Sequence, residues 1–208
     1  MAASDLSTEE RILKAAHTVF VQEGTQAASL KDIAREADVN QALLHYYFSD
    51  KKTLADTVFE EVVSDFLPQL QAILTSDQSV EAKVQTFVPT YIDALRANPY
   101  LPSYVIGELN QNPEELKERI RSMGLAPFED LDALDEQLRQ RAEDGTLRPI
   151  SAEQFVVNLV ALCIFPFVAR PLLEAMLGLE DRFDAFLDER KEQIPPFFLG
   201  ALRPDPDS

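Results

Sequence analysis

The stretch from residue 29 to residue 54, SLKDIAREADVNQALLHYYFSDKKTL, constrains the fold of this chain more than any other. Ser29 and Asn40 are residue types that accept a hydrogen bond from the first turn of a helix, and each precedes a short helical pattern. Asp38 lies between the two patterns and tolerates a positive φ better than most residues, which suits a sharp turn. We therefore expect a short helix, a tight turn and a second short helix that begins at Gln41.

A longer helix is expected on each side of this pair. Ser7 and Glu10 have the spacing of a capping box, so the preceding helix should begin near Thr8. Gly24 suits the left-handed residue just past the end of that helix. Asp50 can cap the helix that follows. A tight turn between two short helices is the arrangement that places one helix in the major groove of DNA, so this segment predicts a helix-turn-helix.

Helical periodicity continues after residue 50, whereas strand-like alternation does not occur. Only six of the 208 residues are glycine, which also argues against a turn-rich β protein. The expected fold class is all-α. We expect an N-terminal three-helix helix-turn-helix DNA-binding domain over residues 1–50 and a C-terminal helical domain for effector binding and dimerisation over residues 51–208.

Serine and proline residues predict where the later helices begin and end. Ser79 and Ser151 can each cap a helix, and a last helix is expected over about residues 180–200. Pro68 should kink or end the helix that follows the helix-turn-helix. Pro89 should interrupt the next helix, because proline removes a backbone donor and clashes with the preceding turn.

Three segments, ERILKAAHTVFVQEG, SLKDIAREADV and LLHYYFSDKKTL, occur in order and at suitable separations. With these segments, residues 8–60 resemble the DNA-binding domain of the TetR family of one-component transcriptional regulators. The resemblance implies an all-helical homodimer whose C-terminal domain binds an effector, and effector binding that usually weakens operator binding. The chain departs from the family pattern with Asp38 in place of the usual Gly, and with Ala42-Leu43 where Gly-Thr is common. These departures affect the operator contacts rather than the fold.

Side chains at the N-terminal end of a recognition helix reach base edges. Gln41 is expected to read adenine in a bidentate way, and Ala42 is small enough to touch a thymine methyl group. His45 lies one turn later and faces the same groove, where it would contact a base or a phosphate. Lys52 would either contact a phosphate or remain a solvated surface charge. The candidates for phosphate contacts are Ser29, Lys31, Asn40, Tyr46 and Lys51.

The net charge of −17 has the wrong sign for a general nucleic-acid binder. The acidity is uneven, because residues 1–60 contain six basic and ten acidic residues, whereas the other 148 contain 13 and 26. Long-range repulsion should suppress non-specific binding to DNA and leave the affinity to a few local contacts. An alternative is a helical protein-interaction adaptor that has lost specific DNA binding, which the acidic balance and Asp38 favour.

Two strongly apolar helix faces occur near the C-terminus. The family resemblance implies that they form a four-helix bundle across a two-fold axis. Such a dimer would set the two recognition helices about one DNA turn apart, roughly 34–36 Å, so the operator should be a near-palindrome. The residues expected at this dimer interface are Phe155, Leu159, Leu162, Phe183, Phe186, Leu187, Ile194 and Phe197.

The site for a small lipophilic effector is less clearly marked in the sequence. Aromatic residues at helical spacing would either line a pocket between helices or form plain core. Asn158 is a polar residue in an apolar helix, so it would either bind the ligand or pair across the dimer seam. The aromatic candidates for the pocket are Phe66, Phe87, Tyr91, Tyr104, Phe128 and Phe165.

Other classes of protein are disfavoured by composition. The single Cys163 cannot form an internal disulfide or a cysteine-based metal site, and no metal or other cofactor is expected. Both His residues lie within the first 45 positions and no Gly-rich phosphate loop is present, so an enzyme is not expected. The most apolar run, residues 155–169, is too short to span a bilayer. The polar, acidic N-terminus does not resemble a signal peptide, so we expect a cytoplasmic protein.

Overall fold

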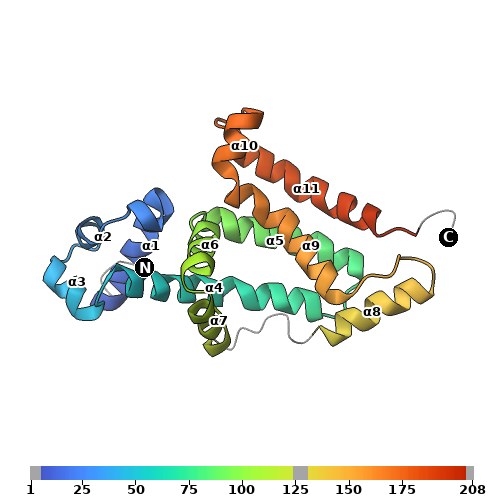
Figure 1. The fold of residues 1–208 in the computed structure, drawn as a ribbon, viewed down its shortest axis with the longest axis horizontal. Helices are drawn as coiled ribbons and strands as arrows, with labels where there is room; N and C mark the ends of the chain where they lie inside the picture. Colours follow the sequence, from blue (N-terminus) through green and yellow to red (C-terminus); the bar gives the residue numbers. More distant parts are fainter. Residues whose placement is uncertain (1–5, 124–130, 205–208) are drawn as a thin grey trace. The chain divides into compact units, whose positions relative to one another are not determined.

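The computed structural model describes residues 6–123 and 131–204. Within these residues every element is a helix and no strand occurs, which confirms the all-α prediction (Figure 1). The chain forms two compact units. Unit 1 comprises Met1–Asp65 and Ala97–Leu116, and unit 2 comprises Phe66–Arg96 and Lys117–Ser208. The domain boundary after residue 50 stays a prediction, because the compact units divide the chain at other points.

Unit 1 contains α1 (Thr8–Ala27), α2 (Leu30–Glu36), α3 (Gln41–Tyr47), α6 (Leu101–Gln111) and the first part of α4 (Lys51–Thr75). The caps predicted from the sequence are present. Ser7 and Glu10 form the full capping box, and the side chain of Ser29 accepts from the backbone N–H of Asp32. The side-chain oxygens of Asn40 and Asp50 each accept at 2.8 Å from a backbone N–H three residues later.

Two residues of unit 1 have a positive φ, as the sequence predicts. Asp38 has φ +53 in the turn between α2 and α3. Gly24 has φ +76, a conformation that costs glycine little because it has no Cβ. The helix α1 kinks at Gly24 rather than ending there, and a short helical stretch continues to Ala27.

The core of unit 1 joins α6 to α1 and to the first part of α4. Ile12, Phe20, Ile33, Leu44 and Leu54 are fully buried. Tyr100, just before α6, packs against Phe20 with ring centroids 5.9 Å apart, and Tyr104 in α6 packs against Phe59 at 5.1 Å. The sequence did not indicate that α6 belongs to this unit, because about 40 residues separate it from the first part of α4.

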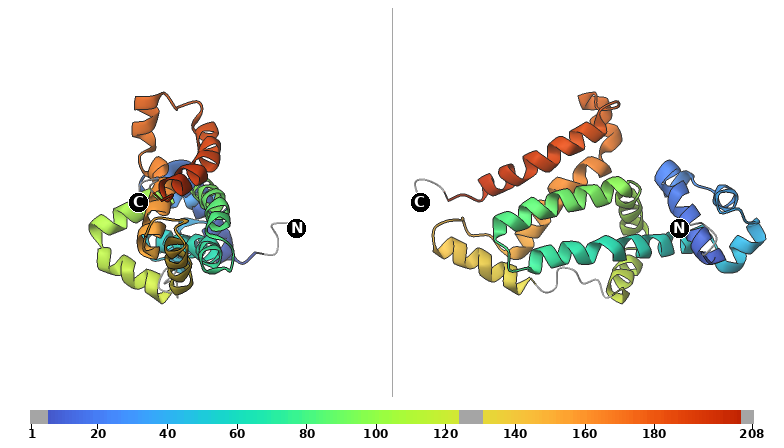
Figure 2. Two further views of the ribbon diagram at one scale, coloured as in Figure 1. Left: turned by 90° about the vertical axis from the view of Figure 1, so that its right-hand side faces the viewer. Right: turned by 180° about the vertical axis from the view of Figure 1, so that it is seen from behind.

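Unit 2 contains α5 (Val80–Ala97), α8 (Asp132–Glu143), α9 (Ala152–Val168), α10 (Arg170–Leu177) and α11 (Phe183–Ala201), drawn from two further sides in Figure 2. A further helix, α7 (Pro113–Ser122), ends in this unit. Ser79 and Ser151 cap α5 and α9 as predicted, and α11 confirms the predicted last helix. α10 was not anticipated; it ends at Gly178, whose φ is +63.

The predicted interruption at Pro89 is wrong, because α5 continues through it. The helix α4 also continues through Pro68, so the helix does not end there, and a kink at Pro68 stays a prediction. The buried Leu70 and Leu74 after Pro68, and Tyr91 and Ile92 after Pro89, anchor the continuing turns in the core. Tertiary packing thus overrides the local cost of proline.

A proline within α9 has a specific compensation. Pro166 has no backbone N–H, so the carbonyl of Leu162 lacks its usual partner four residues later. Arg190 in α11 supplies the missing donor, because its Nη2 lies 2.5 Å from that carbonyl oxygen. The proline therefore links α9 to α11.

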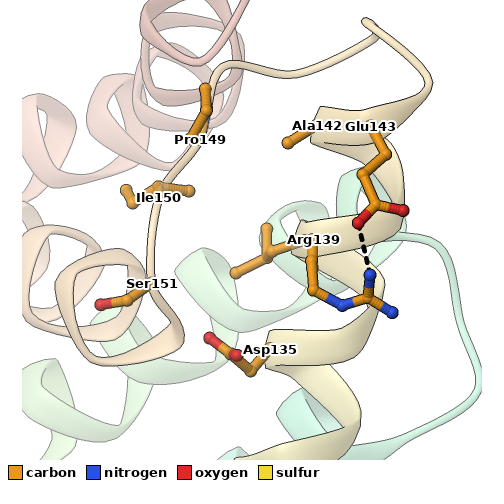
Figure 3. Close-up of a pocket in the computed structure, with 8 residues that line it drawn as sticks. Asp135, Arg139, Ala142, Glu143, Pro149, Ile150 and Ser151 are labelled. Carbon is orange, nitrogen blue, oxygen red and sulfur yellow. Dashed lines mark hydrogen bonds and ion pairs between the residues drawn. The ribbon is translucent and has the colours of Figure 1, made fainter.

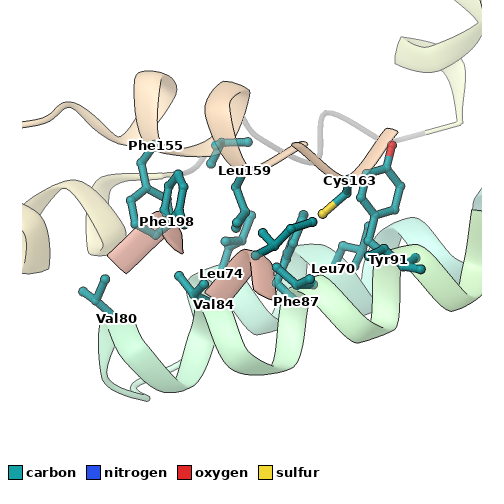
Figure 4. Packing of buried hydrophobic residues seen from close by; sticks show 14 of the residues in the cluster. Leu70, Leu74, Val80, Val84, Phe87, Tyr91, Phe155, Leu159, Cys163 and Phe198 are labelled. Atoms are coloured by element: carbon teal, nitrogen blue, oxygen red, sulfur yellow. The ribbon is translucent and has the colours of Figure 1, made fainter. Parts of the chain in front are cut away.

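The hydrophobic core of unit 2 gathers side chains from α4, α5, α9 and α11 (Figure 4). Phe155 and Phe198 meet edge to face with their ring centroids 5.0 Å apart. Cys163 lies in this core with the thiol 1% exposed, and burial raises its pKa to about 12. A neutral thiol at this depth is unreactive.

Lys83 is a charged residue in the core of unit 2. Its side chain in α5 is 0% exposed, and its Nζ donates to Oε1 of Gln137 in α8 at 2.6 Å. Burial lowers the pKa of Lys83, and the Asp77 carboxylate opposes this shift more weakly. The ammonium group therefore costs free energy in the folded state, because a single neutral amide replaces its hydration.

We expect the substitution Lys83→Met to raise the free energy of unfolding at neutral pH by at least about 1 kcal/mol, because it keeps the side-chain length without the charge. The folded-state pKa is lowered, so the cost of the wild-type amine shrinks as the pH rises toward lysine's ordinary range. Urea denaturation at several pH values should show the advantage of the variant fading with rising pH. Lys14→Met, at an exposed position in α1, should change stability by less than about 0.5 kcal/mol at every pH.

Candidate nucleic-acid interface

The exposed face of α3 carries the residues expected to read DNA. Gln41, Ala42, His45 and Tyr46 are all exposed, and their spacing places them on one side of the helix. Leu44, on the opposite side, is fully buried and holds α3 in unit 1. Tyr46 is 81% exposed and meets Tyr47 edge to face at 5.4 Å. The structure thus brings four of the predicted DNA-contacting side chains together on one open face.

Ser29 and Asn40 both have structural roles as caps. The hydroxyl of Ser29 donates to the carboxylate of Asp32 and also accepts from its backbone N–H. Asn40 uses its side-chain oxygen to cap α3, so its exposed NH₂ group is still available to a phosphate oxygen. Of these two candidates, Asn40 is therefore the better donor to DNA.

The lysines at the start of α4 are engaged within unit 1. Nζ of Lys51 donates to the carbonyl oxygens of Gln26 and Ala28, both at 3.1 Å, and so holds the segment that follows α1. Nζ of Lys52 lies 3.0 Å from Asp56 and 2.7 Å from Glu115. Burial opposes the shift, but hydrogen bonds to these carboxylates raise the pKa of Lys52. Lys31, in contrast, is exposed on α2.

Arg11 holds the turn between α2 and α3, a role that the sequence did not reveal. Its Nη2 donates to the carbonyl oxygen of Ala37 at 2.6 Å and to that of Asp38 at 3.1 Å. The same nitrogen lies 3.9 Å from the Asp38 carboxylate. A residue of α1 therefore fixes a turn about 26 residues away, and no local pattern could have indicated this contact.

We expect Arg11→Met to lower the free energy of unfolding by about 1–3 kcal/mol, because two turn carbonyls lose a charged donor. Operator affinity should fall as well, since the turn sets the direction of α3. Arg35→Met is the matched control: this exposed arginine pairs only locally with Asp32, so its loss should cost under about 1 kcal/mol. Equal effects of the two substitutions, measured by thermal melting and by DNA titration, would contradict this role of Arg11.

The aromatic candidates for an effector pocket lie in different places. Phe66 stacks on Tyr91 at 6.2 Å, and Tyr91 meets Phe87 at 5.7 Å, all within unit 2. Burial raises the pKa of Tyr91. Tyr104 belongs to unit 1, where its hydroxyl donates to Asp56. Phe128 falls outside the described residues.

Asn158 and Phe165 line a separate groove between α9 and α11, with a volume of about 460 Å³. Its other lining residues include Arg148, Leu162, Arg190, Phe197 and Phe198. A second hollow, of about 590 Å³, lies between α8 and the segment before α9 (Figure 3). The polar groups of this second hollow bind one another: Arg139 pairs with Glu143, and Asp135 accepts from the backbone N–H of Ala152. They offer little to a ligand.

The structure places most of the predicted dimer residues in the core of their own unit. Phe155, Leu159, Phe183, Leu187 and Ile194 are buried, and Leu162 and Phe186 are half-buried. Only Phe197 is strongly exposed, at 67%. In the single chain these five buried side chains leave little surface open to a second copy, and their place in a dimer interface stays a prediction. The large apolar side chains that α9, α10 and α11 leave exposed are Val157, Phe165, Val168, Leu172, Met176, Leu177 and Phe197.

The described residues contain no group of three or more His, Cys, Asp or Glu side chains that could hold a metal ion. Within the same ranges no single helix is long and apolar enough to cross a membrane. Only α9 and α10 taken together pass by length and composition, and they are bent by 73°.

The α2–turn–α3 arrangement and the open face of α3 define a helix-turn-helix DNA-binding protein.

Comparisons with known proteins agree with this class. Residues 12–58 match the family model described as bacterial regulatory proteins, tetR family. The uncharacterized HTH-type transcriptional regulator TtgW of Pseudomonas putida is 30% identical over 96 residues, which cover 46% of this chain and 69% of that protein. The probable HTH-type transcriptional regulator YttP of Bacillus subtilis is 22% identical over 200 residues, 95% of each chain.

A solved structure extends the likeness of fold to nearly the whole chain. HlyIIR, a haemolysin II transcriptional regulator, superposes with a TM-score of 0.57 at 23% identity and covers 95% of this chain and 98% of that one. The chain therefore belongs to the TetR family of transcriptional regulators.

Proposed function

We propose that this TetR-family regulator is a cytoplasmic repressor that binds a near-palindromic operator as a homodimer and is released by a small lipophilic effector. The observation that carries the proposal is the open face of α3, where Gln41, Ala42, His45 and Tyr46 are exposed together. Asn40 caps this helix and Arg11 fixes the turn before it. A rigid helix with polar side chains near its N-terminal end is suited to reading base edges in the major groove.

Contacts to phosphate would come mostly from uncharged groups. With Lys51 and Lys52 engaged inside unit 1, Lys31 is the best-placed lysine, and Asn40 and Tyr46 add an amide and a hydroxyl group. Such contacts position a protein on DNA without adding much long-range attraction. The acidic chain would then bind DNA only where the shape and the base contacts fit together.

The salt dependence of operator binding tests this arrangement. If one lysine in each subunit meets a phosphate, a dimer neutralises about two phosphates, and log K against log salt should have a slope of about −2. If Lys51 and Lys52 leave their partners for DNA, about six phosphates are neutralised and the slope approaches −5. We expect the shallow slope in fluorescence anisotropy titrations of an inverted-repeat duplex; a steep slope would show that the internal bonds of these lysines break on binding.

Gln41→Ala should weaken operator binding by about 1–3 kcal/mol and relax the preference at one base pair, because it removes a bidentate contact. Lys31→Gln should weaken binding to all sequences about equally. Sedimentation velocity should show the same subunit assembly for both variants. A substitution of Lys51 would not isolate a DNA contact, because it would also remove the hydrogen bonds to the carbonyl oxygens of Gln26 and Ala28. Unchanged DNA binding in Gln41→Ala would favour the adaptor alternative, which the acidic charge and the engaged lysines also support.

The proposed contact face for a second copy consists of the seven exposed apolar residues on α9, α10 and α11 named above. Scattered single apolar residues are normal on a surface, but a contiguous apolar group usually marks an interaction site. Val157, Phe165 and Val168 occur at helical spacing on α9, and Leu172 and Met176 on α10. A two-fold contact through this face would remove them from water and pair the two DNA-reading units.

Met176→Asp should convert the dimer to monomers at low micromolar concentration, because it places a charge on a side chain that is 70% exposed within the proposed contact face. Ile106→Asp, at an apolar residue of α6 that is 43% exposed in unit 1, is the matched control and should leave the assembly unchanged. Sedimentation velocity distinguishes the two results. A Met176→Asp variant that remains dimeric would place the contact elsewhere.

The proposed effector is lipophilic because the groove between α9 and α11 and the core of unit 2 are lined mainly by apolar side chains. The stacked Phe66, Tyr91 and Phe87 belong to the packed core, whereas Asn158 and Phe165 line an open groove. A ligand that binds one conformation of unit 2 more tightly than another shifts the population of that conformation. A shift that changes the spacing of the two recognition helices would release the operator.

A further inference from the structure

The groove between α9 and α11 combines an apolar wall with positive charge. Phe165 of α9 and Phe197 and Phe198 of α11 supply aromatic surface, and Leu162 adds to it. Phe165 is 57% exposed and Phe197 is 67% exposed, so both present open apolar surface in the single chain. The volume of about 460 Å³ is within the range of small-molecule sites.

Arg148 and Arg190 line the same groove, and neither forms an ion pair in the described part of the chain. Carboxylates are plentiful in this chain, which has 36 acidic and 19 basic residues. Several arginines of unit 2 have acidic partners: Arg96 pairs with Asp188, Arg141 with Glu81 and Arg170 with Glu174. Among the described residues Arg182 and Arg203 also lack an ion pair, but they do not line this groove. Two guanidinium groups without a carboxylate therefore meet at one apolar groove, where an anion would complement both.

The guanidinium group of Arg190 is held in place. Its Nη2 donates to the Leu162 carbonyl that Pro166 leaves open, and its Cζ lies 5.7 Å from the ring centroid of Phe186. Nε of Arg190 is buried and without a partner among the described residues, so a ligand in the groove would meet the other N–H groups of this side chain. A fixed guanidinium with unused N–H groups is well prepared to bind a carboxylate, since little side-chain entropy is lost on binding.

We propose that this groove binds an amphipathic carboxylate, with its hydrocarbon chain along the phenylalanine side chains and its carboxylate at Arg190 and Arg148. The inference rests on the proposed function and names the chemical class of its effector. Asn158, which also lines the groove, offers an amide donor to the same head group. A neutral lipophile would fill the apolar wall but leave both charges without a counterion.

The groove overlaps the proposed contact face for a second copy. Phe165 and Phe197 belong both to the groove and to the proposed contact face for a second copy. A bound hydrocarbon chain would therefore change the surface that the second copy meets. The packed cluster of Phe66, Phe87 and Tyr91 need not open for this to happen.

The test is calorimetric titration of the full-length protein with dodecanoate, with dodecan-1-ol and with dodecyltrimethylammonium, each kept below its micelle-forming concentration. Dodecanoate should bind at least about ten-fold more tightly than the alcohol, because it forms charge-assisted hydrogen bonds, and the cation should bind most weakly. Equal affinity for the acid and the alcohol would overturn the proposal, and so would an absence of dodecanoate binding.

Variants locate the site. Arg148→Gln should weaken dodecanoate binding at least about five-fold, and Arg190→Gln at least about ten-fold, while the affinity for the alcohol changes little. Arg190→Lys, which keeps the charge, should restore part of the loss. Arg139→Gln on α8 removes the same charge from unit 2 outside the groove and should leave binding unchanged. Ala161→Phe, which fills the groove, should weaken binding of both the acid and the alcohol.

Two controls keep the outcomes distinct. Thermal melting identifies a variant that fails to fold. If Arg190→Gln fails to fold, Arg148→Gln is used in its place, because Arg148 is exposed. If Arg148→Gln and Arg190→Lys change the assembly in sedimentation velocity but not dodecanoate binding, the groove belongs to the second copy and the proposal is overturned. If dodecanoate binds in the groove without changing operator affinity, the site stands and effector release fails. If a ligand releases the operator and its binding depends on neither arginine, effector release stands and the groove site fails.

Discussion

The turn before α3, and with it the direction of the exposed face of α3, is held by the hydrogen bonds from Arg11 to the carbonyl oxygens of Ala37 and Asp38. Asp38 adopts a left-handed conformation that is costly for a residue with a side chain, so the turn needs support from outside. The guanidinium group of α1 provides that support and an opposite charge. Because the turn fixes the direction of α3, the exposure of Gln41 and its neighbours follows from a bond on the other side of the unit.

Charge has a different role in each unit. In unit 1 the lysines at the start of α4 bind carbonyl and carboxylate oxygens, so they stabilise the unit instead of attracting DNA from a distance. A strongly acidic protein with few open cations has little affinity for arbitrary DNA, and geometry must supply most of its selectivity. In the described part of unit 2, Arg148 and Arg190 have no acidic partner, and both line one apolar groove.

Local signals in the sequence predicted local structure well. The caps at Ser7, Ser29 and Asn40 and the positive φ of Asp38 were all readable, because each depends on residues a few positions apart. Features that depend on distant residues were not readable, including the place of α6 in unit 1 and the bonds of Lys51. The expected break at Pro89 failed for the same reason, since packing decided it.

The candidate site was only partly accessible to sequence reasoning. The four exposed residues of α3 were predicted from their offsets in the motif, which the turn geometry preserves. The apolar residues near the C-terminus were recognised as a group, but hydrophobicity alone cannot separate core from surface. Phe155 and Phe197 are the same residue type, yet one is 0% exposed and the other 67%. Only the rotation of each helix about its own axis distinguishes them.

Pro166 has a mechanical consequence for unit 2. The carbonyl that it leaves open accepts from Arg190, so this bond is lost if α11 slides along α9 by even a single turn. The carbonyl of Leu162 would then lose its only protein donor in the described structure, which costs free energy. The two helices should therefore travel as one rigid block, with any flexing confined to the segments that join them to the rest of the unit.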